Sequence, residues 1–228
     1  MKEVNLLPRN KYPEETVQKI LDVSMKLFVE KGYEQTTVLD IVSNLGGLTR
    51  GAFYHHFKSK EDVFFAISDK MFRDHNPFEA LKGRDDLNGL EKLRQIFLSR
   101  TDILDEPENA DYISFHQIGI SLLTQPHFLA EQLKSNQMIA TILSSFIEEG
   151  MSDGSIRPGD PKLLAELIII LFNVWMLPSL FPMTMDEFEK KSVMIGIALD
   201  ALGCPVMNEG FDDSVGETFA KILGIEDV

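Results

Sequence analysis

The 228-residue chain has few of the features expected of a secreted or membrane protein. Its only cysteine is Cys204, which excludes an internal disulfide, and it contains no Asn-x-Ser/Thr glycosylation acceptor. Its first ten residues carry charges around a short apolar stretch, unlike a signal peptide. The most apolar stretch, Leu163–Leu177, is interrupted by Glu166 and Asn173 and is shorter than the roughly 20 residues that cross a bilayer. We therefore expect a cytoplasmic protein without a transmembrane helix.

Basic residues are also scarce, with 22 Lys and Arg against 36 Asp and Glu, giving a net charge of -14. The excess of acid is uneven along the chain. Residues 1–75 hold 11 basic and 11 acidic residues, whereas residues 76–228 hold 11 and 25. Within the neutral part, residues 41–60 contain Arg50, Lys58 and Lys60 and no acid. This segment is a local basic surface on an acidic protein, and clustered basic residues are what polyanion binding requires.

Motifs of catalysis and metal binding are missing as well. Cys204 has no convincing base motif beside it, and the sequence has no phosphate loop and no zinc pattern. His55 and His56 are adjacent, so on a helix they point about 100 degrees apart and are poorly placed to chelate one metal. We expect a protein that is not an enzyme, with no catalytic residues, no cofactor and no metal.

Helical periodicity recurs throughout, and no strict alternation persists over a useful length, so the expected fold class is all-α. The first helix should follow Pro13 and end at Gly32. The next three should begin at the hydroxyl side chains of Thr37, Thr49 and Ser59, which can each cap a helix N-terminus. The fourth helix should end near residue 75.

Six further helices are expected in the second part of the chain: 87–104, 110–123, 127–149, 161–177, 185–202 and 214–223. The segments 76–86 and 150–160 are interpreted as connections. The chain then divides into an N-terminal domain, residues 1–75, and a larger domain, residues 76–228.

The most informative segment is residues 36–57, with the basic residues that follow it. Two short helices joined by a glycine turn form a helix-turn-helix, whose second helix can enter a DNA major groove. Phe53 and Phe57 are four residues apart and should face the core. The opposite face should present Arg50, Gly51, Tyr54, His55 and Lys58. Two aromatic residues and two histidines in so short a helix favour a binding face over a merely solvated one.

This segment resembles the DNA-binding signature of the tetracycline-repressor (TetR) family. The resemblance covers roughly residues 17–72 and is carried by Thr37, Ile41, Leu45-Gly46, Thr49-Arg50-Gly51-Ala52-Phe53-Tyr54-His55-His56-Phe57 and Lys58-Ser59-Lys60-Glu61-Asp62. A looser likeness runs from Glu149 to Arg157, ahead of Asp160-Pro161.

The resemblance implies a role for each DNA-facing residue. Thr37 and Thr49 should bind phosphate, and Arg50 and Gly51 should approach bases. The backbone or base edges should be met by Tyr54, His55, His56 and Lys58. For His56 a core role is as well supported, because its spacing from Phe53 turns it partly inward.

One feature departs from the family pattern. Members usually have one glycine and one apolar residue in the turn of the helix-turn-helix, whereas Gly46-Gly47-Leu48 inserts a residue. Gly47 either lengthens the turn only, which is the favoured interpretation, or changes the angle of the recognition helix.

For the larger domain the resemblance implies a homodimer formed through the helices at about 161–177 and 185–202, and a pocket for a small-molecule effector. The candidate pocket residues mix apolar surface with a few polar groups: Tyr112, Phe115, His116, Met138, Phe146, Asn173 and Trp175. For any one of them taken singly, a place in a plain core is the favoured interpretation. The expected function is a transcriptional regulator that binds double-stranded operator DNA, a repressor released by its effector. The alternative is an effector-independent helical module that binds DNA or another protein.

Overall fold

A computed structural model describes residues 13–102, 110–208 and 213–225. Over these ranges all regular secondary structure is helical and there is no strand, which confirms the expected all-α class. Across the same ranges, no helix combines the length and the apolar character needed to span a membrane. Contacts within the chain separate unit 1, Met1–His75, from unit 2, Asn76–Val228.

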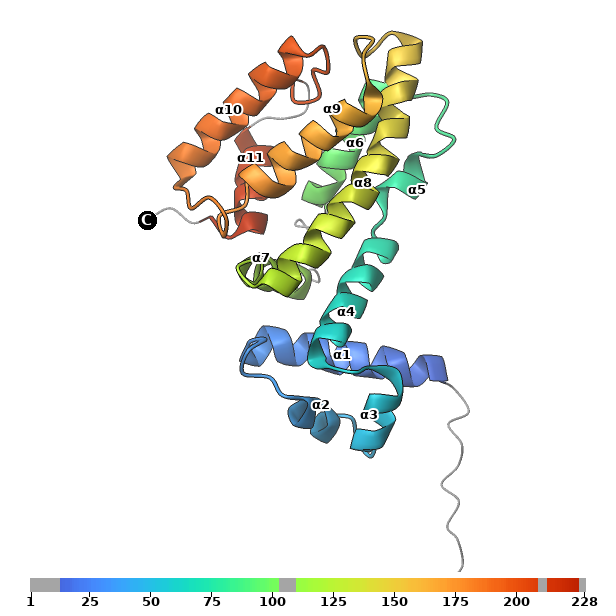
Figure 1. Cartoon of the computed structure of the whole chain (residues 1–228), viewed down its shortest axis with the longest axis vertical. Coiled ribbons are helices and arrows are strands. Elements are labelled where there is room, and N and C mark those ends of the chain that lie inside the picture. The colour runs from blue at the N-terminus through green and yellow to red at the C-terminus, as the bar shows by residue number, and fades with distance from the viewer. Residues whose placement is uncertain (1–12, 103–109, 209–212, 226–228) are drawn as a thin grey trace, which may run out of the picture. The chain divides into compact units, whose positions relative to one another are not determined.

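Unit 1 contains four helices (Figure 1). They are α1 (Pro13–Lys31), α2 (Val38–Asn44), α3 (Arg50–His56) and α4 (Lys60–Asp74). Each contributes to one core, whose fully buried side chains include Ile20, Phe28, Ile41, Leu45, Phe53 and Val63. The rings of Phe28, Tyr33 and Phe64 pack together, with centroids 5.1 to 6.0 Å apart. This core holds α2, α3 and α4 together with α1.

The helices of unit 1 begin and end at the signals in the sequence. The hydroxyl oxygens of Thr37, Thr49 and Ser59 accept hydrogen bonds from the backbone N–H groups three residues ahead, at 3.1, 3.2 and 3.1 Å. Each bond satisfies a donor that the first helical turn leaves without a partner. At the end of α1, Gly32 has a φ of 91°, a left-handed conformation that glycine adopts without strain. The helix starts and the first stop are confirmed.

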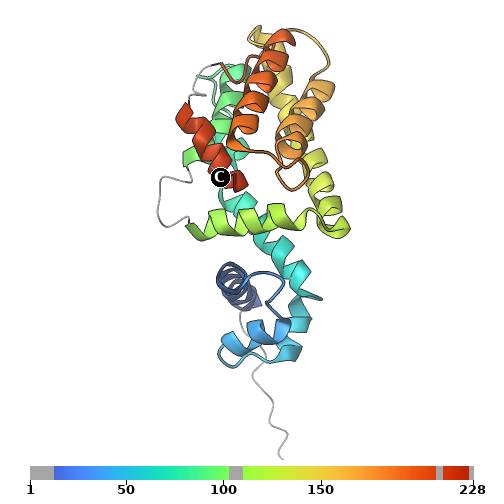
Figure 2. The ribbon, with the colours of Figure 1, turned by 90° about the vertical axis from the view of Figure 1, so that its left-hand side faces the viewer.

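Unit 2 is built around α8, which runs alongside α6 and α9 (Figures 1 and 2). Its helices are α5 (Pro77–Leu81), α6 (Gly89–Asp102), α7 (Ala110–Leu122), α8 (Pro126–Asp153), α9 (Pro161–Ile170), the π-helix η2 (Leu171–Trp175), α10 (Met185–Ala201) and α11 (Asp213–Leu223). Its core includes Leu93, Leu143, Ile147, Ile168 and Ile195. The six expected helices are present with boundary shifts.

Two segments interpreted as connections contain helix. The short helix α5 lies within residues 76–86, where Asn76 Oδ1 accepts from the Phe78 N–H at 3.0 Å and Phe78 and Leu81 are buried. Helix α8 continues four residues beyond the expected end at Glu149, to Asp153, and stops at Gly154 with a φ of 85°. Gly150, which was assigned to the connection, is instead buried inside α8.

The helix expected over residues 161–177 is not continuous as an α-helix. It changes to a π-helix at Leu171–Trp175. Two side-chain contacts from other helices hold this wider turn: the Asn173 amide donates to Asn136 Oδ1 at 3.1 Å, and Lys191 Nζ donates to the Trp175 carbonyl at 3.0 Å. Insertions of this kind depend on tertiary partners and have no periodic signal of their own.

The start of α6 is pressed against the end of α8. A Cβ built at Gly89 would lie 2.2 Å from the backbone nitrogen of Gly150, so only glycine fits. The Gly89 N–H donates to Asp153 Oδ2 at 2.7 Å, and the Leu90 N–H donates to Ser155 Oγ at 3.2 Å. Nearby, the buried ammonium of Lys92 pairs with Glu149. These contacts add to the local cap of α6, where Asn88 Oδ1 accepts from the Glu91 N–H at 2.9 Å and Glu91 Oε2 accepts from the Asn88 N–H at 2.8 Å.

Candidate nucleic-acid interface

The outer face of α3 carries the side chains expected to meet DNA. Phe53 is fully buried and Phe57 nearly so, so the face of α3 that was expected to be buried is the buried one. The exposed residues of the set are Thr37, Thr49, Arg50, Gly51, Tyr54, His55 and Lys58, while His56 is half-buried. The half-buried position of His56 is intermediate between its two expected roles. Except for Thr37, the exposed set therefore lies on α3 or beside its two ends.

Neighbouring side chains on this face contact one another. The Arg50 guanidinium lies over the ring of Tyr54, 5.5 Å from its centroid, and the rings of His55 and His56 are 5.1 Å apart. A guanidinium that lies over an aromatic ring keeps its N–H groups, which lie in the guanidinium plane, available to other acceptors. Lys58 is exposed and forms no ion pair with any residue that the structure describes. The face thus offers two cations and a phenol to an anionic partner.

Gly51 is not required by the packing of unit 1. A Cβ built there would contact only Thr49 Oγ1, at 3.7 Å, which is an ordinary van der Waals distance. Glycine inside a helix costs about 1 kcal/mol relative to alanine. No neighbour in the described part of the chain needs this small residue, so packing within unit 1 does not account for it.

The turn between α2 and α3 is built from two left-handed glycines. Gly46 and Gly47 have φ values of 59° and 103°, and a Cβ at Gly47 would meet nothing within 4 Å. The backbone conformation, and not crowding, is what restricts this position to glycine. The residue inserted relative to the family pattern therefore forms a second left-handed step before Leu48.

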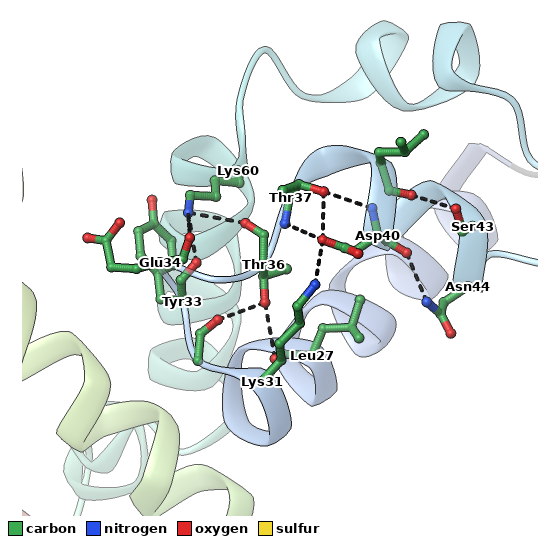
Figure 3. A network of polar contacts seen from close by, with 12 residues as sticks. Leu27, Lys31, Tyr33, Glu34, Thr36, Thr37, Asp40, Ser43, Asn44 and Lys60 are labelled. Carbon is green, nitrogen blue, oxygen red and sulfur yellow. Dashed lines mark hydrogen bonds and ion pairs between the residues drawn. The ribbon is translucent and has the colours of Figure 1, made fainter.

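Thr37 is engaged more fully than its expected role as a phosphate contact suggests. Its N–H and its hydroxyl both donate to Asp40 Oδ2, at 2.8 and 2.6 Å, in a reciprocal capping box (Figure 3). Lys31 Nζ lies 2.8 Å from the same oxygen. Its hydrogen bond, followed by those of Thr37, holds the pKa of Asp40 well below its ordinary value. A phosphate would compete with this carboxylate for the Thr37 hydroxyl.

Lys60 lies with Arg50 and Lys58 in the basic segment of the sequence, but the structure separates it from them. Its ammonium lies against the backbone of the turn between α1 and α2, donating to the carbonyls of Tyr33 and Thr36 at 2.7 and 3.2 Å (Figure 3). Sequence analysis also missed Lys31 as the partner of Asp40. No local pattern links residues nine or more positions apart in this way.

The candidate effector residues of unit 2 differ widely in exposure. Phe115 and Phe146 are buried, Tyr112, Asn173 and Trp175 are half-buried, and His116 and Met138 are exposed. Some of their contacts are with residues outside the set: Phe146 packs on Phe78 with centroids 6.3 Å apart, Asn173 donates to Asn136, and Trp175 lies under Lys191.

Asn136 is a polar residue that sequence analysis overlooked. Its side chain is buried, and its Oδ1 accepts from Gln132 Nε2 at 2.9 Å and from Asn173 Nδ2 at 3.1 Å. The signal was present, because Asn136 falls on the same helical face as the buried Ile139, Ala140 and Leu143. A buried amide on an apolar face needs partners, and here they come from α8 itself and from η2.

Unit 1 is a helix-turn-helix domain joined to a larger helical unit, which defines the class of the protein. Residues 20–67 match the family described as bacterial regulatory proteins, tetR family. The chain is 30% identical over 138 residues to the HTH-type transcriptional repressor KstR2 of Mycobacterium tuberculosis, a match that covers 58% of this chain and 66% of the relative, just under two thirds of its length. Residues 20–67 therefore carry the signature of the tetR family, and the chain is similar to a repressor with a helix-turn-helix.

Solved structures share the fold across nearly the whole chain. A transcriptional regulator from Cytophaga hutchinsonii superposes with a TM-score of 0.58 at 16% identity, covering 92% of this chain and 96% of that one. A regulator of the TetR/AcrR family from Thermobifida fusca gives 0.54 at 23% identity, covering 86% and 98%. Both sequence matches are to transcriptional regulators, which favours the expected regulator over an enzyme.

Proposed function

We propose that the protein is a transcriptional repressor that binds operator DNA as a homodimer and leaves it when a small-molecule effector binds unit 2. The observation that carries the proposal is the outer face of α3, where exposed Arg50, Tyr54, His55 and Lys58 surround a glycine that the fold does not need. The relative KstR2 is a repressor by name, which supports this direction of control.

The chemistry of the face suggests a division of roles. Arg50 can donate two parallel hydrogen bonds to the O6 and N7 atoms of guanine. Lys58 and the N-terminus of α3 suit phosphates, because a helix N-terminus carries partial positive charge and free N–H groups. Tyr54 and His55 can donate to phosphate while resting against sugars. Gly51 allows the helix backbone to approach the bases.

A homodimer is supported by apolar side chains that unit 2 leaves exposed on two helices. Leu163 and Ile170 on α9, and Val193, Met194 and Ile197 on α10, are each more than half exposed. Five large apolar side chains exposed to this degree on two helices are costly to leave in water. Pairing α9 and α10 with the same helices of a second copy would cover it in a four-helix interface.

The effector site is proposed in unit 2, where Asn173 and Trp175 lie on the π-helix η2 next to buried Asn136. Such π-turns occur frequently at functional sites. Trp175 is the only tryptophan of the chain, so its fluorescence reports on this segment alone. An effector bound there should change the emission of Trp175 and lower operator affinity in the same concentration range.

Selection from random duplex DNA tests the proposal. We expect a near-palindromic site whose half-sites lie about one helical turn apart or somewhat more. Arg50→Ala should relax the preference at particular bases and cost about 1 to 3 kcal/mol on the selected site. Recovery of no site, or of asymmetric sites only, would contradict a dimeric DNA-binding regulator. Effector-dependent release separates the repressor from the alternative, an effector-independent helical module, which has nothing to release.

A further inference from the structure

We infer that Lys60 is a positioning residue for DNA binding: it holds the turn before α2 in place and does not itself neutralise a phosphate. The inference rests on the proposed function, since it concerns how the DNA-binding face is held. Lys60 is the first residue of α4, and two positions before it in the sequence is Lys58, the exposed cation of the α3 face. The two lysines have opposite surroundings.

The ammonium of Lys60 is surrounded by acceptors of the turn between α1 and α2. Nζ donates to the carbonyl oxygens of Tyr33, Thr36 and Glu34, at 2.7, 3.2 and 3.4 Å (Figure 3). It also lies over the Tyr33 ring, 4.2 Å from the centroid. An ammonium has three N–H donors, and three carbonyls use all of them. A phosphate could accept a hydrogen bond from this ammonium only if at least one of the three carbonyls lost its own.

The turn that Lys60 holds leads directly into α2. It starts at the left-handed Gly32 and ends at Thr37, the N-cap of α2. Thr36, almost completely buried, ties the same turn back to α1 by donating to the carbonyls of Gly32 and Leu27, at 2.8 and 3.2 Å. Lys60 links this turn to α4 by hydrogen bonds, beside the packing of the Tyr33 ring on Phe64.

Lys60 thereby connects three helices of unit 1 at one point. Its backbone begins α4, its side chain holds the residues that precede α2, and those residues follow α1. Converging carbonyl dipoles repel one another unless a cation or several donors lie between them. Without the ammonium, we expect the turn to open and α2 to lose its fixed position relative to α3, which lowers the affinity for every DNA sequence.

The salt dependence of DNA binding distinguishes a positioning lysine from a phosphate contact. Each neutralised phosphate contributes about 0.9 to the slope of log K against log salt concentration. The full-length wild type, Lys60→Met and the matched control Lys58→Ala would be titrated with the duplex recovered by selection, at several salt concentrations. Methionine retains most of the apolar stem of lysine and removes the charge.

For Lys60→Met we expect a loss of about tenfold at every salt concentration with the wild-type slope. For Lys58→Ala we expect a slope smaller by about 0.9. A slope reduced in Lys60→Met as much as in Lys58→Ala would overturn the inference. So would wild-type affinity and slope in Lys60→Met.

A measurement on the wild-type protein decides the matter if Lys60→Met does not fold. The ammonium protons of Lys60 should exchange slowly enough with water to give an NMR signal in the free protein, assigned by its loss in Lys60→Arg. Addition of the selected duplex should leave that signal in place. Absence of the signal from the free protein, or a shift on adding DNA comparable to that of Lys58, would overturn the inference. If the wild type binds no duplex, the proposed function fails, whereas the signal in the free protein still tests the placement of Lys60.

Discussion

In unit 1, α2, α3 and α4 each follow a hydroxyl residue whose side chain accepts a hydrogen bond from the backbone N–H three positions ahead. In unit 2, α6 also has a local cap at Asn88, but the N–H groups of Gly89 and Leu90 donate to Asp153 and Ser155, 64 and 65 positions further along the chain. The first arrangement uses information from four consecutive residues. The second exists only after α6 and α8 have packed together.

Two glycines inside helices show the consequence of this difference. Gly51 in α3 has free space around its absent side chain, whereas Gly89 in α6 has the backbone of Gly150 where a Cβ would be. The fold explains the second glycine but not the first, which we assign to the proposed approach of DNA to α3. Substitutions in the two units should therefore separate into losses of binding and losses of stability.

The largest effect is expected from Gly89→Ala. The added methyl group would overlap the backbone of Gly150, so α6 and α8 must move apart and the unfolding free energy of unit 2 should fall by about 3 kcal/mol. Chemical denaturation followed by helical circular dichroism measures the change. Gly216→Ala is the control, because a Cβ there would meet nothing within 4 Å. An unchanged stability of Gly89→Ala would show that the contact between α6 and α8 is looser than described.

The next largest effect is expected on assembly. Ile197 on α10 is 66% exposed within the chain, so Ile197→Glu should leave the protomer folded while placing a charge in the proposed interface. The dimer dissociation constant should rise about a hundredfold or more. Analytical ultracentrifugation measures it, with Leu133→Glu on exposed α8 surface as the control. A dimer of unchanged strength in Ile197→Glu would exclude α10 from the interface.

Gly51→Ala should give the reverse of Gly89→Ala. We expect no loss of thermal stability, and a gain of up to about 1 kcal/mol from helix propensity, because the added Cβ fits beside Thr49. Affinity for the selected duplex should nevertheless fall about tenfold, since the methyl group would hold the backbone of α3 away from the bases. Calorimetry and a fluorescence-anisotropy titration measure the two quantities. A destabilised variant would mean that Gly51 serves the fold.

The smallest effect is expected from Cys204, a fully buried thiol of unit 2. Burial raises its pKa to about 11 from an ordinary value of 9.0. Burial favours the protonated thiol in the folded state. The stability that depends on a protonated Cys204 is therefore complete below pH 9.0 and is lost as the pH rises through about 11. Thiol labelling at pH 8 should be slow for the native protein and fast in denaturant. Equal rates would show that Cys204 is accessible in the folded state.

Much of the recognition helix could be predicted from the sequence, because its determinants lie close together. The spacing of Phe53 and Phe57 fixed which face of α3 is buried, and Thr49 fixed where the helix begins. The sequence shows equally well that Lys60 is charged, but it does not show in which direction the side chain points. A side chain with four rotatable bonds follows whichever acceptors the folded chain brings near, here carbonyls 24 to 27 positions away.

The sequence by itself determined the all-α class, the helix starts of unit 1 and the outward face of α3, since each depends on residues within one or two helical turns. Only the tertiary structure decided the close crossing of Gly89 and Gly150, the π-helix at Leu171–Trp175 and the inward turn of Lys60. These features depend on atoms that meet only when distant segments pack. Hydrogen-bond partners and close contacts of that kind have no fixed spacing in the sequence.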